Sequence, residues 1–170
     1  CATQLIKVLG ECTCSFTTVL YGMEALKNAG FRELALSDMN NWELQNGDKV
    51  FVNVYDSSLF AFTIGENYDG NGMLRLVASH TDSPALYIKP SPEMKCKKYG
   101  KLNVEVYGGP ILNTWLDRPL SVAGKLAIRG KSVFEPEVVV VDFKKNLLTI
   151  PNLAIHLNRE INKGIELNRQ

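Results

Sequence analysis

The side chains best suited to chemistry are His80 and Asp82, which lie two residues apart in the segment SHTDSP (residues 79–84). This segment follows the apolar run LRLVA (residues 74–78), which we expect to form a buried strand. Open α/β sheets bind ligands beyond the carboxyl ends of their strands, so His80 would lie in a cleft. A neutral imidazole binds a divalent metal through one ring nitrogen, and its other nitrogen needs a partner that fixes the ring. The spacing is therefore compatible with a metal ligand, His80, oriented by Asp82.

The same residues allow a structural interpretation. Asp82, Ser83 and Pro84 are typical of a turn, and His80 would then be a hydrogen-bonded histidine at the end of a strand. Short motifs also match by accident. The spacing alone leaves both interpretations open.

Composition and charge narrow the class of protein. The chain has 170 residues with 45% hydrophobic composition, enough for one domain or for parts of two. Its 19 basic and 18 acidic residues leave a formal net charge of +1. This balance gives no electrostatic reason to expect nucleic acid or a membrane surface as a partner. No run is long enough to span a membrane and no secretory signal is visible, so we expect a cytoplasmic protein.

The four cysteines do not form a familiar metal-binding pattern. Cys12 and Cys14 form a C-x-C pair, and Cys1 and Cys96 lie apart from one another in the sequence. A structural zinc site typically uses paired C-x-x-C spacing. We therefore expect free thiols in a reducing compartment.

Two helices are predicted near the amino terminus. Residues 2–9 carry apolar side chains with no breaker before Gly10, which indicates a short amphipathic helix. Ser15 or Thr17 can cap a second helix, and Gly30 can end it in a left-handed conformation. Its apolar face consists of Phe16, Val19, Leu20, Met23 and Leu26.

Strands follow these helices. From Lys49 the apolar period changes to two, which predicts a strand, and residues 56–58 form a turn into a second strand over residues 59–64. With the run at residues 74–78, the first eighty residues contain two helices and then three strands.

The second half has a different pattern. A connector rich in proline and lysine is expected from Lys89 to Lys101. Candidate strands lie beyond it at residues 102–106, 122–129, 138–143 and 147–150. This shift favours a β domain inserted into, or appended to, an α/β domain.

Three segments, in this order, resemble the M18 aminopeptidases, a family that includes aspartyl aminopeptidases and the yeast vacuolar aminopeptidase. They are ASHTDSP (residues 78–84), YGGPILNTWLDRPL (residues 107–120) and IPNLAIHLNR (residues 150–159). The resemblance implies an α/β fold. Residues 1–89 would be the amino-terminal part of a zinc-exopeptidase-like α/β domain, and residues 90–170 part of an inserted, β-rich dimerisation domain.

The resemblance also implies roles for particular residues. His80 matches the first ligand of a two-zinc site, and Asp82 matches the carboxylate that orients it. His156 matches a histidine that reaches the neighbouring subunit's active site, where it would hydrogen-bond the oxyanion. The apolar flanks of His156, taken alone, favour a core or interface histidine instead. We expect Asp117 and Arg118 to form a structural ion pair and not to bind metal.

The implied activity is metal-assisted hydrolysis that releases the amino-terminal residue of short peptides, in a homo-oligomer built from dimers, with two zinc ions per subunit. The chain has only two histidines, and it lacks the further ligands and general base that the family requires. We therefore expect it to be the amino-terminal part of a longer enzyme and inactive alone. An alternative is a non-catalytic dimerisation or regulatory module. A glutamyl aminopeptidase or deacetylase of the same clan would share the His-x-Asp pair but lack the segments around residues 114–118 and 155–157.

Overall fold

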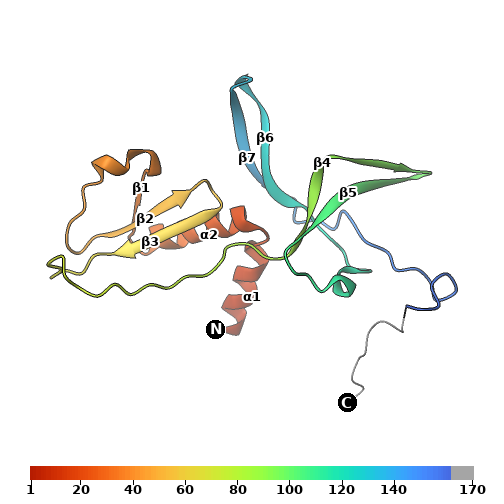
Figure 1. Cartoon of the computed structure of the whole chain (residues 1–170), viewed down its shortest axis with the longest axis horizontal. Coiled ribbons are helices and arrows are strands. Elements are labelled where there is room, and N and C mark those ends of the chain that lie inside the picture. The colour runs from red at the N-terminus through yellow and green to blue at the C-terminus, as the bar shows by residue number, and fades with distance from the viewer. Residues whose placement is uncertain (162–170) are drawn as a thin grey trace, which may run out of the picture.

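The computed structural model describes residues 1–161 of the chain (Figure 1). The first part contains the helices α1 (Ala2–Glu11) and α2 (Ser15–Asn28), strand β1 (Arg32–Leu34), the 3-10 helix η1 (Leu36–Asn41), and strands β2 (Lys49–Val54) and β3 (Ser58–Thr63). The second part contains β4 (Ala85–Cys96), β5 (Tyr99–Tyr107), the 3-10 helix η2 (Leu112–Trp115), β6 (Ala123–Ser132) and β7 (Glu135–Asp142).

Both predicted helices are confirmed, but the cap of α2 differs from the expectation. The N-cap residue is Cys14, not Ser15 or Thr17. Thr17 occupies the third helical position, and its Oγ1 accepts a hydrogen bond from the Cys14 N–H at 3.0 Å. Because that hydroxyl satisfies the N–H at the cap, the cap residue itself needs no hydroxyl. Gly30 follows the helix with φ of +82°, as predicted for a left-handed stop.

A three-stranded sheet in the order β1-β2-β3 carries the core. β1 runs parallel to β2, and β2 pairs antiparallel with β3. Val50 and Val52 of the central strand pack with Leu34 on one face. Partly buried side chains cover this cluster, namely Leu36, Trp42, Val54 and Phe62.

Helix α2 packs against β2 and β3, and Phe51 of β2 is fully buried. Lys27 of α2 lies 5.8 Å from the centroid of the Phe51 ring, which places this side chain on the helix-covered face. Burial of a side chain of this size stabilises the fold by about 1.5–3 kcal/mol. β2 is thus covered on both faces and forms the rigid centre from which the next segments extend.

Two long hairpins, β4–β5 and β6–β7, extend away from this sheet (Figure 1). The expected connector at Lys89–Lys101 is wrong, because β4 and β5 occupy most of it. The pairing shifts register between Ile88 and Glu93, and Pro90 and Pro92 lie in that interval. Proline cannot donate to a strand ladder, so an irregular stretch accommodates it.

The other predicted strands of the second half have mixed outcomes. Residues 102–106, 122–129 and 138–143 fall largely within β5, β6 and β7, which confirms those predictions. Residues 147–150 make only two isolated bridges, from Leu148 and Ile150. The boundary proposed between residues 89 and 90 lies within β4, and the division into domains stays a prediction.

The buried strand expected at residues 74–78 is wrong. This segment has no regular secondary structure, and Leu74 and Val77 are 88% and 96% exposed. It runs as an extended chain between β3 and β4 (Figure 1). The apolar pattern suits a strand, but none of the strands in residues 1–161 pairs with it. In the same part of the chain, no helix combines the length and apolar character needed to span a membrane.

Candidate functional site

The segment that carries His80, residues 79–84, lies between the extended chain and the first residue of β4, Ala85. We call it the histidine loop. Thr81 Oγ1 donates a hydrogen bond of 2.7 Å to the Ser57 carbonyl in the β2–β3 turn. On its other side lies Gly108, with φ of +76°, where an added Cβ would be in ordinary contact with the Pro84 Cα at 3.4 Å. The loop is therefore held by the central sheet and by the end of β5.

His80 and Asp82 are in contact, but the shorter contact is with the Asp82 backbone and not with the carboxylate that the sequence analysis expected as its partner. His80 Nδ1 lies 2.7 Å from the Asp82 backbone oxygen and 3.2 Å from Asp82 Oδ1. Both neighbours of Nδ1 can only accept a hydrogen bond, so Nδ1 carries the proton in the neutral ring. The Nε2 lone pair is then free, and the His80 side chain is 81% exposed. This arrangement can present Nε2 to a metal ion.

Tyr107, the last residue of β5, is a further part of this site that the sequence analysis missed. Its hydroxyl donates to Asp82 Oδ2 at 2.5 Å. This hydrogen bond is the main reason that the pKa of Asp82 lies below its ordinary value, and it raises the pKa of Tyr107 to about 12. The sequence held one clue to this role, since Tyr107 is the first residue of the segment at residues 107–120, which carries part of the family resemblance. Its contact with Asp82 was not evident because 25 residues separate the two.

His156 belongs to a different segment from the histidine loop, and no hydrogen bond among residues 1–161 connects the two. It is exposed and belongs to a turn in which the N–H groups of Leu157 and Asn158 donate to the Ala154 carbonyl at 2.8 and 3.1 Å. Within residues 1–161, no hydrogen bond or ion pair joins His156 to His80 or Asp82. The structure thus brings together two of the three predicted site residues.

The expected ion pair between Asp117 and Arg118 is wrong. The Asp117 carboxylate instead accepts hydrogen bonds from the backbone N–H and the side-chain Nδ2 of Asn152, at 2.8 and 3.0 Å. These bonds, the backbone one first, hold the pKa of Asp117 below its usual range. Asp117 has a left-handed φ of +56°, and its own N–H donates to the Ile150 carbonyl at 2.9 Å. Two segments behind the resemblance are therefore in contact, and Asp117 has a structural role.

Within residues 1–161, no three His, Cys, Asp or Glu side chains gather so that they could hold a metal ion. All four cysteines are free thiols, as predicted. Structural and catalytic zinc sites need three or four protein ligands. His80 therefore fits zinc as a single oriented ligand and not as a complete site.

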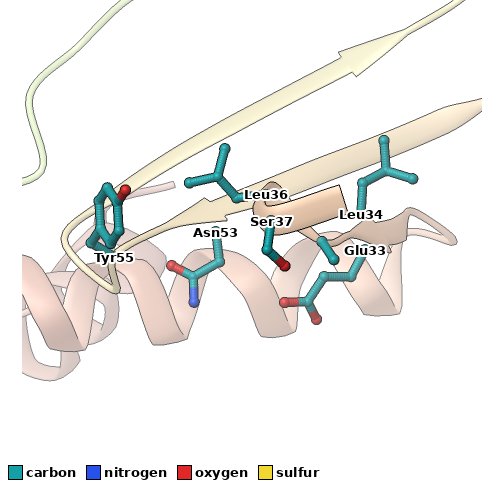
Figure 2. Close-up of a pocket in the computed structure, with 7 residues that line it drawn as sticks. Glu33, Leu34, Leu36, Ser37, Asn53 and Tyr55 are labelled. Atoms are coloured by element: carbon teal, nitrogen blue, oxygen red, sulfur yellow. The ribbon is translucent and has the colours of Figure 1, made fainter. Parts of the chain in front are cut away.

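A separate hollow lies beside β1 and β2 (Figure 2). Residues 33–37, Asn53 and Tyr55 line it, and its volume is about 440 Å³. Glu33 is its only acidic side chain, and it pairs with Lys27 at 2.8 Å. Its lining contains no imidazole or thiol, and its one carboxylate is paired, so nothing in it indicates a metal site.

Comparisons of sequence place the chain among known proteins. The family model described as "Aminopeptidase I zinc metalloprotease (M18)" matches residues 9–170. The "Probable M18 family aminopeptidase 2" of Clostridium acetobutylicum is 45% identical over 170 residues, which are 99% of this chain and 39% of that protein. The protein of the same name from Azotobacter vinelandii is 44% identical over 147 residues, 86% of this chain and 33% of that protein. The chain thus spans about two fifths or less of the length of these curated relatives.

Solved structures agree with this placement. The structure described as "Cryo-EM structure of the Ape4 and Nbr1 complex" contains a chain that matches with a TM-score of 0.91 and 30% identity, covering 100% of this chain and 32% of that one. The structure described as "Structure of S. cerevesiae mApe1 dodecamer" matches with a TM-score of 0.82 and 25% identity, over 91% of this chain and 36% of that one. The α/β fold and the resemblance are confirmed, and the chain belongs to the M18 family of zinc aminopeptidases.

Proposed function

We propose that this chain is part of a zinc-dependent aminopeptidase that removes the amino-terminal residue from short peptides. The supporting observation is the arrangement of His80, whose Nδ1 is bound to Asp82 and whose Nε2 is free and exposed. This is the arrangement expected of a metal-binding histidine with its orienting partner. The M18 family supports the reaction class.

The chain would supply only the first part of a two-zinc site. His80 is one ligand, and residues 1–161 hold no group of three potential ligands. The remaining ligands and the general base would come from a longer polypeptide, consistent with relatives of which this chain spans 39%. When bound, zinc supplies Lewis-acid polarisation of a carbonyl and a water that ionises near neutral pH.

The residues of this chain would have distinct tasks. Asp82 would keep the His80 proton on Nδ1 and hold the ring in one orientation. His156 would act across a dimer, donating a hydrogen bond to the oxyanion on the substrate. Its exposed position, without a hydrogen bond to the histidine loop among the described residues, is consistent with a role in a neighbouring subunit.

The exposed surface supports an assembly larger than this chain. The chain exposes 14603 Å² of surface, whereas a folded monomer of 18.9 kDa exposes about 8300 Å². Much of that surface is apolar and includes Leu74, Val77, Val133 and Phe134. Such patches mark surfaces that are covered in the functional protein. The rest of a longer polypeptide or another subunit would cover this surface. We include a homo-oligomer built from dimers in the proposal because one similar structure is described as a dodecamer, and a cytoplasmic location, which the four free thiols support.

Two histidine variants of the complete protein test this proposal. His80→Ala should lose bound zinc, measured by plasma emission, together with hydrolysis of aminoacyl p-nitroanilides. His156→Ala should keep its zinc but lose about 10²–10³-fold in kcat, because it removes an oxyanion donor. Each variant serves as the control for the other.

Full zinc content and full turnover in His80→Ala would contradict the proposal. A complete wild-type protein that neither binds zinc nor hydrolyses peptides would instead favour the non-catalytic module.

A further inference from the structure

We infer that Tyr107 is a positioning residue, which fixes the Asp82 carboxylate and through it the His80 imidazole for metal binding. This inference rests on the proposed function, because it assigns Tyr107 a task within the same site. The residue lies outside the histidine loop and joins it to the β4–β5 hairpin.

The two oxygens of Asp82 are used in different directions. Oδ2 accepts the Tyr107 hydroxyl at 2.5 Å, and Oδ1 lies 3.2 Å from His80 Nδ1. A distance of 2.5–2.7 Å is typical of a strong, charge-assisted O–H···O⁻ bond. A carboxylate held at one oxygen cannot rotate freely, so the direction of the other oxygen is also set. Tyr107 thereby sets the direction of the carboxylate contact with the imidazole, which adds to the 2.7 Å hydrogen bond between His80 Nδ1 and the Asp82 backbone oxygen.

The Tyr107 ring is itself held in place. Tyr107 pairs with Ala85 at the foot of the hairpin, so the backbone of β5 ends beside the histidine loop. Tyr87 of β4 stacks on the Tyr107 ring, with centroids 4.4 Å apart and an interplanar angle of 11°. Diagonal neighbours on one face of an antiparallel pair commonly make such contacts. The hydroxyl therefore points at Asp82 from a rigid support.

Asp82 would have little else to orient it. Its side chain is about one third exposed, and within residues 1–161 its side-chain partners are Tyr107 and His80. The His80 side chain in turn is 81% exposed, and its ring is restrained by its two contacts with Asp82, to the backbone oxygen and to Oδ1. Without the Tyr107 hydroxyl, water would replace one partner of the carboxylate, and the carboxylate would sample several rotamers. The imidazole would then keep its 2.7 Å hydrogen bond to the Asp82 backbone oxygen, but without a fixed carboxylate beside it its orientation would be less restricted.

The test is zinc affinity, measured on the complete protein after metal removal, by competition with a chromophoric chelator. The zinc ion that the wild type binds and His80→Ala does not is the ion whose affinity is compared among the variants. Tyr107→Phe keeps the stacked ring and removes the hydroxyl, and it should weaken zinc binding at that site about tenfold, the lower end of the range for outer-shell partners. Tyr99→Phe is the matched control, since Tyr99 lies on the same strand with an exposed side chain, and it should leave zinc affinity unchanged.

A double-mutant cycle separates positioning from a general structural role. In an Asp82→Asn background, Tyr107→Phe should change zinc affinity by less than about twofold, because residues that act through one another are not additive. A tenfold loss that persists in that background would overturn the inference, as would unchanged affinity in Tyr107→Phe alone. If His80→Ala lost no zinc, the proposed function would fail together with the inference. Zinc loss in His80→Ala with normal affinity in Tyr107→Phe would overturn only the role of Tyr107.

Discussion

Replacing Thr81 with valine should loosen the histidine loop without damaging the core. The change keeps the shape of the side chain and removes the hydroxyl that donates to the Ser57 carbonyl at 2.7 Å. A hydrogen bond of this kind contributes about 0.5–1.5 kcal/mol net. Ser57 is only half-buried, so water can reach its carbonyl and the desolvation penalty stays small. We therefore expect a cost of about 1 kcal/mol.

This cost sets an upper limit on the loss of zinc affinity. Apparent affinity falls in proportion to the fraction of molecules whose loop is in the binding conformation. A change of about 1 kcal/mol lowers that fraction by up to about fivefold. The full factor is approached only if the disordered state already predominates, and a loop with equal ordered and disordered populations would lose about threefold. The exposed residues and few anchors of this loop favour a measurable loss.

Thr114→Val is the matched control. Thr114 Oγ1 donates to the Ile111 carbonyl at the same distance of 2.7 Å, but in the 3-10 helix η2. Competition with a chromophoric chelator gives the zinc affinity of each variant, and urea unfolding gives its stability. Thr81→Val should bind zinc more weakly, whereas Thr114→Val should bind it as the wild type does. Equal zinc affinities in the two variants would refute the reasoning that Thr81 anchors the site.

Two further predictions concern the β6–β7 hairpin. Lys125 Nζ lies 2.8 Å from Asp56 Oδ2, and this bond is the main cause of the lowered pKa of Asp56. A lowered pKa stabilises the fold above the unfolded-state value of about 3.9 and loses that effect as pH falls through the folded-state value. Urea unfolding should therefore show Lys125→Met costing about 0.5–1 kcal/mol at pH 7. At pH 2 the cost should fall to the part due to the Phe16 ring and to the hydrogen bond that Lys125 donates to the Tyr55 carbonyl. An equal cost at both pH values would exclude the ion pair. In Gly130→Ala the new Cβ would clash with the Glu135 carbonyl oxygen, so amide exchange in β6 and β7 should accelerate while β2 stays protected. Unchanged exchange would show that the hairpin accommodates the added methyl group.

The elements with a strong local pattern could be predicted from the sequence. β2 alternates valines with other side chains, and α2 carries an apolar face and a terminal glycine. Both signals depend on neighbouring residues alone. The short strand β1 escaped notice because its sequence, REL, is too brief to show a period. Much of strand β4 was mistaken for a connector, since the prolines at its irregular register look locally like loop residues.

The errors share a physical origin in long-range pairing. Residues 74–78 have the pattern of a strand, but a strand requires a neighbour, and the described part of the chain supplies none. Asp117 appeared to pair with the adjacent Arg118, but its backbone conformation turns it toward Asn152 instead. Tyr107 was missed as a partner of Asp82 because only the pairing of β4 with β5 brings it there.

The most direct measurement is X-ray diffraction from the zinc-loaded complete protein, with anomalous data collected on both sides of the zinc edge. The account predicts an anomalous peak about 2.0–2.1 Å from Nε2 of His80, with Nδ1 still bound to Asp82. A zinc peak remote from His80, or one bound through Nδ1, would contradict it.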